Sequence, residues 1–154
     1  ALMNREVALN QLHHINQKEI AMANLAASRS SRSAVKNTAT RIKADHQALE
    51  TRVEEVARAR SVTLAKYTPA TYEEVTMDKL EALEGADFDT AFAQVMKDGH
   101  KLTSAQLRIL RNRVSDREVL ALIDQALPKV RMHEEKSKNV LSSIKTENDY
   151  SARR

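Results

Sequence analysis

The chain has 154 residues, which is enough for one domain with a hydrophobic core and too few for two ordinary domains. Two glycines, two prolines and 3% aromatic residues point to helices whose core is built from alanine and aliphatic side chains. The absence of cysteine excludes disulfides and thiolate metal ligands, and the net charge of +4 arises from 25 basic and 21 acidic residues that are interspersed without a sustained basic block.

The first half of the chain is predicted to form a helical hairpin. Apolar residues recur at steps of three and four over residues 4–28 and again over residues 33–60, which indicates two long helices. The polar residues 28–33 between them form a short turn, in which a serine can cap the second helix, so the helices should be antiparallel. On the inward face of the first helix the pattern includes Glu19, and on that of the second only His46 breaks the apolar run.

Residues 61–86 are too many for a minimal turn in a compact bundle. They contain Pro69 and an amphipathic run over residues 72–83, which favours a crossover with its own short helix that returns the chain along the bundle. Ferritin-like folds use such a crossover. The alternative is simple up-down-up-down order with a folded loop.

A second hairpin is predicted from helices over residues 87–114 and 116–147. The capping-box pattern at residues 115–118 places a tight turn between them. The last helix contains Pro128, which should kink it about one turn before His133. His133 and His100 both lie on predicted inward faces, and residues 148–154 are expected to be a flexible tail.

The predicted fold is all-α: a single domain over residues 1–147, formed as a ferritin-like four-helix bundle with a long crossover between the second and third long helices. At a rise of about 1.5 Å per residue, Glu19 and His46 lie at similar distances from the first turn, and His100 and His133 from the second. Both pairs fall near the middle of the bundle, so the four side chains can meet.

Three neutral imidazoles and one carboxylate are a ligand set suited to one transition-metal ion. These ligand types favour zinc, although copper, iron or manganese could also bind them. The alternative is that Glu19, His46, His100 and His133 form a hydrogen-bonded polar layer with Asn16, which would fix the register of the helices without a metal.

Other polar side chains are weaker candidates. Asp45 is expected on the flank of its helix, either solvated or orienting a ligand, and a solvated carboxylate is favoured. His13 could approach the cluster from its edge, His14 should be exposed, and surface roles are favoured for both. Met22 and Met96 could supply thioether ligands to copper, although methionine at helical spacing usually belongs to a core.

The sequence does not predict an enzyme. A di-iron oxidase would need Glu-x-x-His motifs, but Lys43 and Val130 stand three residues before His46 and His133. A glycine-rich phosphate loop, a Gly-x-Ser-x-Gly motif and a His-Glu-x-x-His motif are all absent from the sequence.

Four segments resemble a family of bacterial exported proteins of unknown function, which are labelled as outer-membrane or periplasmic and expected to be ferritin-like bundles. The likeness extends over residues 9–141, and its segments are residues 15–20, 42–46, 85–89 and 127–133. It implies an all-helical fold and a periplasmic or envelope location, and it supplies no activity. Where similar proteins tend to have an Asp-His pair, this chain has Gly99 and His100.

The leading hypothesis is therefore a periplasmic bundle that binds one metal ion, in metal handling or envelope stress protection and without turnover. The second is an interaction bundle with a structural polar layer and an unknown protein partner. Nucleic-acid binding is disfavoured by the dispersed charges. A transmembrane segment is also not predicted, since no apolar run approaches the roughly 20 residues that would be needed.

Overall fold

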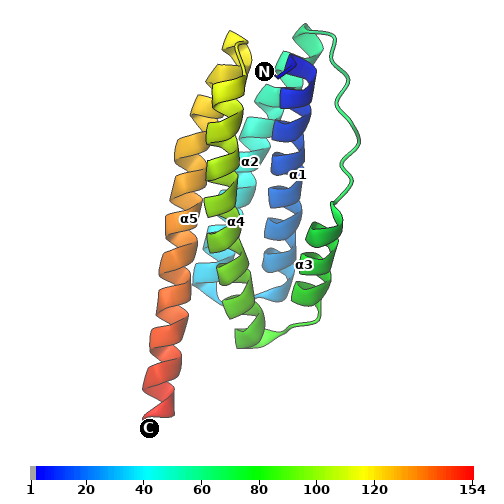
Figure 1. Cartoon of the computed structure of the whole chain (residues 1–154). Helices are drawn as coiled ribbons and strands as arrows, with labels where there is room; N and C mark the ends of the chain where they lie inside the picture. The colour runs from blue at the N-terminus through cyan, green and yellow to red at the C-terminus, as the bar shows by residue number, and fades with distance from the viewer. Residues whose placement is uncertain (1–2) are drawn as a thin grey trace.

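The computed structural model describes residues 3–154, which form five helices and no strand (Figure 1). Four of the helices are long: α1 (Arg5–Arg29), α2 (Ser33–Ala59), α4 (Gly85–Arg113) and α5 (Arg117–Ala152). The fifth, α3 (Thr71–Glu81), is short. The prediction of an all-helical chain is confirmed.

The long helices lie side by side in two hairpins. Helix α1 packs against α2, α4 packs against α5, and the hairpins meet mainly through α2 and α5, with further contacts between α1 and α4. Figure 1 shows that α1 and α5 run in one direction, while α2 and α4 run in the opposite one. Because α2 and α4 are parallel, the up-down-up-down alternative does not describe this chain.

The connection from α2 to α4 runs along the outside of the bundle beside α1, first as an extended segment and then as α3 (Figure 1). Two contacts tie it to α1. The backbone N–H of Ala65 donates to Asn10 Oδ1 at 2.7 Å, and His14 Nε2 lies 2.7 Å from Glu73 Oε1. The connection therefore forms an outer layer over one face of the bundle.

The core consists of two apolar clusters with a buried polar layer between them. One cluster includes Leu12 and Leu49, and the other includes Met22 and Ile42. The residues of the polar layer are all less than 9% exposed, and they are Asn16, Glu19, Asp45, His46, His100 and His133. A polar layer in the middle of an apolar core needs hydrogen-bond partners there, because its residues are buried from bulk solvent.

Three details of the predicted helix ends are wrong. Helix α5 continues past Glu147 to Ala152, through much of the expected tail, because no glycine or proline interrupts the chain there. Its N-cap is Asp116 and not residue 115, with which the capping-box pattern begins. The Oδ1 of Asp116 accepts hydrogen bonds from the N–H groups of Glu118 and Val119. Helix α2 begins after Arg32 without a side-chain cap, because Ser30 Oγ instead accepts the N–H of Arg32 and donates to an aspartate on α4.

Within residues 3–154, every helix falls short of the combined length and apolar character that crossing a membrane would require.

Candidate metal centre

Three histidines from three helices meet in the polar layer. His46 on α2, His100 on α4 and His133 on α5 are each at most 1% exposed, and the centroids of their rings lie 5.2 to 6.2 Å apart. One nitrogen from each ring lies within 4.8 Å of the other two. The structure thus brings together the three histidines that the helical pattern placed inward, and they could hold a metal ion.

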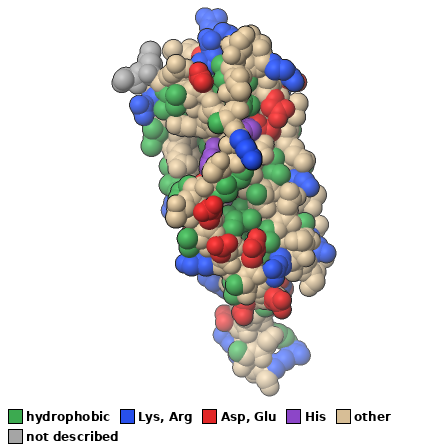
Figure 2. Space-filling view, turned by 90° about the vertical axis from the view of Figure 1, so that its right-hand side faces the viewer, with side chains coloured by type: hydrophobic (Ala, Val, Ile, Leu, Met, Phe, Trp, Pro, Cys, Tyr) green, Lys and Arg blue, Asp and Glu red, His purple; other side chains and the backbone are tan. Residues whose placement is uncertain are grey.

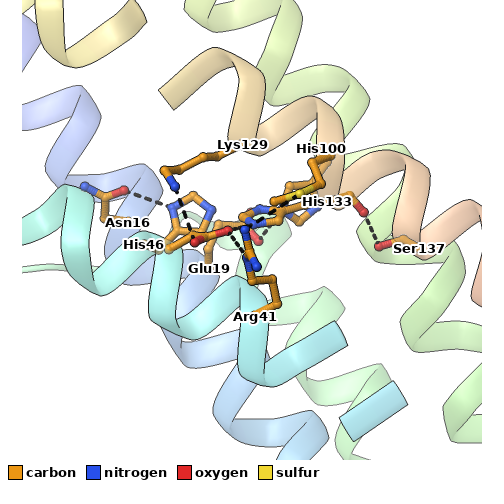
Figure 3. Close-up of polar contacts among 10 residues, drawn as sticks. Asn16, Glu19, Arg41, His46, His100, Lys129, His133 and Ser137 are labelled. Carbon is orange, nitrogen blue, oxygen red and sulfur yellow. Dashed lines mark hydrogen bonds and ion pairs between the residues drawn. The ribbon is translucent and has the colours of Figure 1, made fainter. Parts of the chain in front are cut away.

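Each of these rings is oriented by a hydrogen bond from one of its two nitrogens (Figure 3). His46 Nδ1 lies 2.9 Å from the side-chain amide oxygen of Asn16. His100 Nδ1 lies 2.7 Å from the backbone carbonyl oxygen of Met96. His133 Nε2 lies 2.7 Å from the carboxylate Oδ2 of Asp45. Since all three partners are acceptors, the ring nitrogens that contact them must carry the protons.

The opposite nitrogens therefore carry lone pairs. They are His46 Nε2, His100 Nε2 and His133 Nδ1, and among residues 3–154 they have no hydrogen-bond partner although they are buried. A buried acceptor without a partner costs roughly 1–3 kcal/mol. The three rings that carry these acceptors meet in one place, and a cation bound there would satisfy them.

Glu19 lies at the edge of this group. Its side chain is 2% exposed, and its Oε2 lies 3.3 Å from His100 Nε2, while its Oε1 lies 3.8 Å from Lys18 Nζ. Glu19 is not among the residues whose ligand atoms all lie within 4.8 Å of one another. With His100 protonated at Nδ1, two acceptors face each other across that 3.3 Å contact, and a cation between them would turn repulsion into attraction.

Burial sets the charge of the cluster. It lowers the pKa of both His46 and His133 to about 4, so these rings are neutral at neutral pH and their lone pairs are available. Burial raises the pKa of Glu19, but the basic groups around it, His100 and Lys18 first among them, together outweigh burial and leave that pKa below its ordinary value. The site therefore combines the neutral imidazoles of His46 and His133 with a carboxylate whose pKa is lowered.

Asp45 is the residue whose role the sequence underestimated. The expectation of a solvated carboxylate is wrong, since Asp45 is 7% exposed and accepts hydrogen bonds from His133 and from Arg41 Nε at 2.9 Å. Lys129 Nζ lies 3.5 Å from its Oδ1. Burial raises the pKa of Asp45, but the hydrogen bonds from His133 and Arg41 outweigh it and keep the pKa low. Its position directly before an inward histidine was the available signal.

The remaining candidates lie outside the cluster. His13 Nδ1 contacts Glu50 Oε1 at 2.7 Å, and His14 contacts the crossover through Glu73, so both rings are half-buried against carboxylates. The side chain of His14 keeps 36% of its surface exposed, so the contact with the crossover covers it only in part. Met22 and Met96 pack in the apolar cluster that adjoins the polar layer.

Comparison with known proteins gives a family and no activity. A family model described as "Domain of unknown function (DUF4142)" matches residues 3–140, which include all the residues of the polar layer. No curated protein matches the chain. No solved structure matches it either. Because the family model spans most of the sequence, the chain belongs to the DUF4142 family of domains of unknown function.

Proposed function

We propose that this protein binds a single transition-metal ion, with zinc favoured, through Glu19, His46, His100 and His133, and that it does so without turnover. One observation carries the proposal: three buried histidines each bring a ring nitrogen within 4.8 Å of the other two, and each ring has one nitrogen without a hydrogen-bond partner in the described chain. The carboxylate of Glu19, 3.3 Å from one of them, supplies the fourth ligand.

A purely structural polar layer would account for the hydrogen bonds of the three histidines, but it would not account for the ring nitrogens that have no hydrogen-bond partner in the described chain. Such a layer is stable when its members satisfy one another. Here the histidines donate to Asn16 and Asp45 within the layer and to the Met96 carbonyl, and each ring is still left with one nitrogen that has no partner in the described chain. Metal-ligating histidines characteristically donate the second ring nitrogen to a carboxylate, a carbonyl or a similar acceptor, which fixes the tautomer.

The donor set favours zinc. Zn²⁺ takes imidazole and carboxylate ligands in tetrahedral geometry, whereas copper and iron accept the same ligands with other preferred geometries. In a tetrahedral site with Zn–N bonds of about 2.05 Å, ligand nitrogens lie about 3.3 Å apart. The ring nitrogens here lie within 4.8 Å of one another, so they need to close by up to about 1.5 Å on loading.

We propose that the fold is a ferritin-like four-helix bundle and that the protein acts in the periplasm, in metal handling or envelope stress protection. The parallel course of α2 and α4, joined by a long connection, supports the first part, because ferritin-like bundles have one such crossover (Figure 1). The sequence resemblance to exported proteins supports the second part.

The experiment that tests the proposal is elemental analysis of protein purified without an affinity tag, followed by thermal unfolding with and without a chelator. We expect about one equivalent of metal and a melting temperature that falls on chelation and returns on adding zinc, because a ligand that binds only the folded state stabilises it. No bound metal, and no shift with zinc, copper or iron, would leave the alternative of a structural layer in an interaction protein.

Asp45 offers a test of how the ligands are held. Asp45→Ala removes the acceptor that fixes His133, and we expect zinc affinity to fall about 10- to 100-fold, the usual effect of losing such a partner. Asp45→Asn keeps an acceptor oxygen and should recover much of that loss. Competition with a chromogenic chelator measures both variants.

The matched control is Asp98→Ala, which removes an exposed aspartate of α4 that accepts a hydrogen bond from Gln94. It should bind zinc like the parent. Equal affinities for Asp45→Ala and Asp98→Ala would show that His133 does not depend on Asp45.

A further inference from the structure

A cavity of about 130 Å³ opens between α1, α3 and α4 beside the polar layer. Figure 2 views the face of the molecule on which α3 lies. Glu19 and Met22 of α1 and Met96 and Gly99 of α4 line the cavity, and α3 contributes Glu73. The space therefore reaches from the outer layer of the protein to one of the four proposed ligands.

This cavity differs from three others on the protein because a proposed metal ligand, Glu19, lies in its wall. Three further cavities open on the surface of the described residues, and none of their walls includes Glu19 or a clustered histidine. The three histidines are almost completely buried, so an ion must pass some wall to reach them. Among these four cavities, only the one between α1, α3 and α4 adjoins the site.

Gly99, which precedes His100 in the sequence, lies in the wall of this cavity. A Cβ at this position would meet nothing within 4 Å, so close packing does not require glycine here. In the described chain the one glycine with positive φ is Gly85, so the backbone does not require it either. Glycine inside a helix costs roughly 0.5–1 kcal/mol relative to alanine. What Gly99 provides in return is open space next to a ligand.

Glu19 connects the cavity to the histidines. Its Oε1 is near Lys18, which also lines the cavity, and its buried Oε2 has no hydrogen-bond partner and lies 3.3 Å from His100 Nε2. A cation that enters from the cavity would meet the carboxylate of Glu19 before it meets His100.

We infer that this cavity is the route by which a divalent transition-metal ion reaches the buried histidines, with Glu19 as its first ligand and Gly99 as the residue that keeps the route open. The inference rests on the proposed metal-binding function. It concerns the rate of loading, whereas the proposed function concerns binding at equilibrium, so the two can fail separately.

The test is Gly99→Leu, which fills the cavity without altering a ligand. We expect the rate of Co²⁺ uptake by metal-free protein and the rate of Zn²⁺ release to a chelator both to fall about tenfold or more, equivalent to about 1.4 kcal/mol of barrier. The equilibrium affinity should stay within about twofold of the parent, because a blocked route slows both directions alike. Stopped-flow absorbance measures both rates.

Two matched variants serve as controls. Gly99→Ala adds only a Cβ in open space and should load at the parent rate. Ala121→Leu fills a different cavity, between α2 and α5, that does not adjoin the histidines, and should also load normally. Parent-like rates in Gly99→Leu would overturn the route, as would loss of equilibrium binding in a folded Gly99→Leu protein. Equal slowing in Ala121→Leu would overturn it too. If the parent itself binds no Co²⁺ or Zn²⁺, the proposed function fails.

Discussion

Replacing His133 by alanine is expected to lower the affinity for Zn²⁺ by about a hundredfold or more, which corresponds to about 2.7 kcal/mol of binding free energy. The reason is that the substitution removes one of three histidines that meet in a buried layer and leaves the ion with fewer ligands. Asp45 keeps its contacts with Arg41 and Lys129 in the variant, so its buried carboxylate is not left without a partner. Competition titration against a chelator of known affinity gives the dissociation constant.

The matched control is His14→Ala, because His14 is also a histidine in contact with a buried carboxylate but lies outside the cluster. Its loss should change stability and leave zinc affinity unaltered. Circular dichroism on both variants separates lost binding from lost structure. A folded His133→Ala protein with parent affinity would refute the metal site, and His133→Asn provides a second variant with a side chain closer in size.

The second large effect is loss of stability in mild acid for the metal-free protein. His46 and His133 have a pKa of about 4 when folded, against an ordinary value of 6.5. Between these values the unfolded chain binds more protons than the folded one, so the free energy of unfolding falls as the pH falls from 6.5 to 4. Each histidine can contribute a loss of about 3 kcal/mol, a large share of the roughly 5–15 kcal/mol that holds a typical domain together.

Urea unfolding in the presence of a chelator at pH 7, 5.5 and 4.5 measures this loss. His46→Gln serves as the comparison, because it removes one of the two titrating rings and should make stability depend less on pH over the same interval. The same pH dependence in the parent and the variant would show that burial of His46 does not govern acid stability.

The inward positions could be predicted from the sequence because helical periodicity is a local property. Steps of three and four placed His46, His100 and His133 on apolar faces, and counting from the turns placed them near one level. The structure brings these three together. Local patterns of this kind need no knowledge of which helix lies next to which.

The partners of the ligands could not be predicted in the same way. Asp45 lies one position away from the inward face of α2, and only the packing of α2 against α5 brings it to His133. Whether a flank residue is solvated or buried depends on the neighbouring helix, which periodicity does not reveal. The same limit applies to His14, which is half-buried because the crossover lies over α1.

The polar layer joins the two halves of the chain. Glu19 and His46 belong to the hairpin of α1 and α2, while His100 and His133 belong to that of α4 and α5. Each hairpin can form from contacts close in sequence, and their union depends on contacts across the long connection. A metal ion held by both would make the separation of the hairpins and the release of the ion a single event. Unfolding of the loaded protein would then be cooperative across the whole bundle, whereas the metal-free protein could open between its halves.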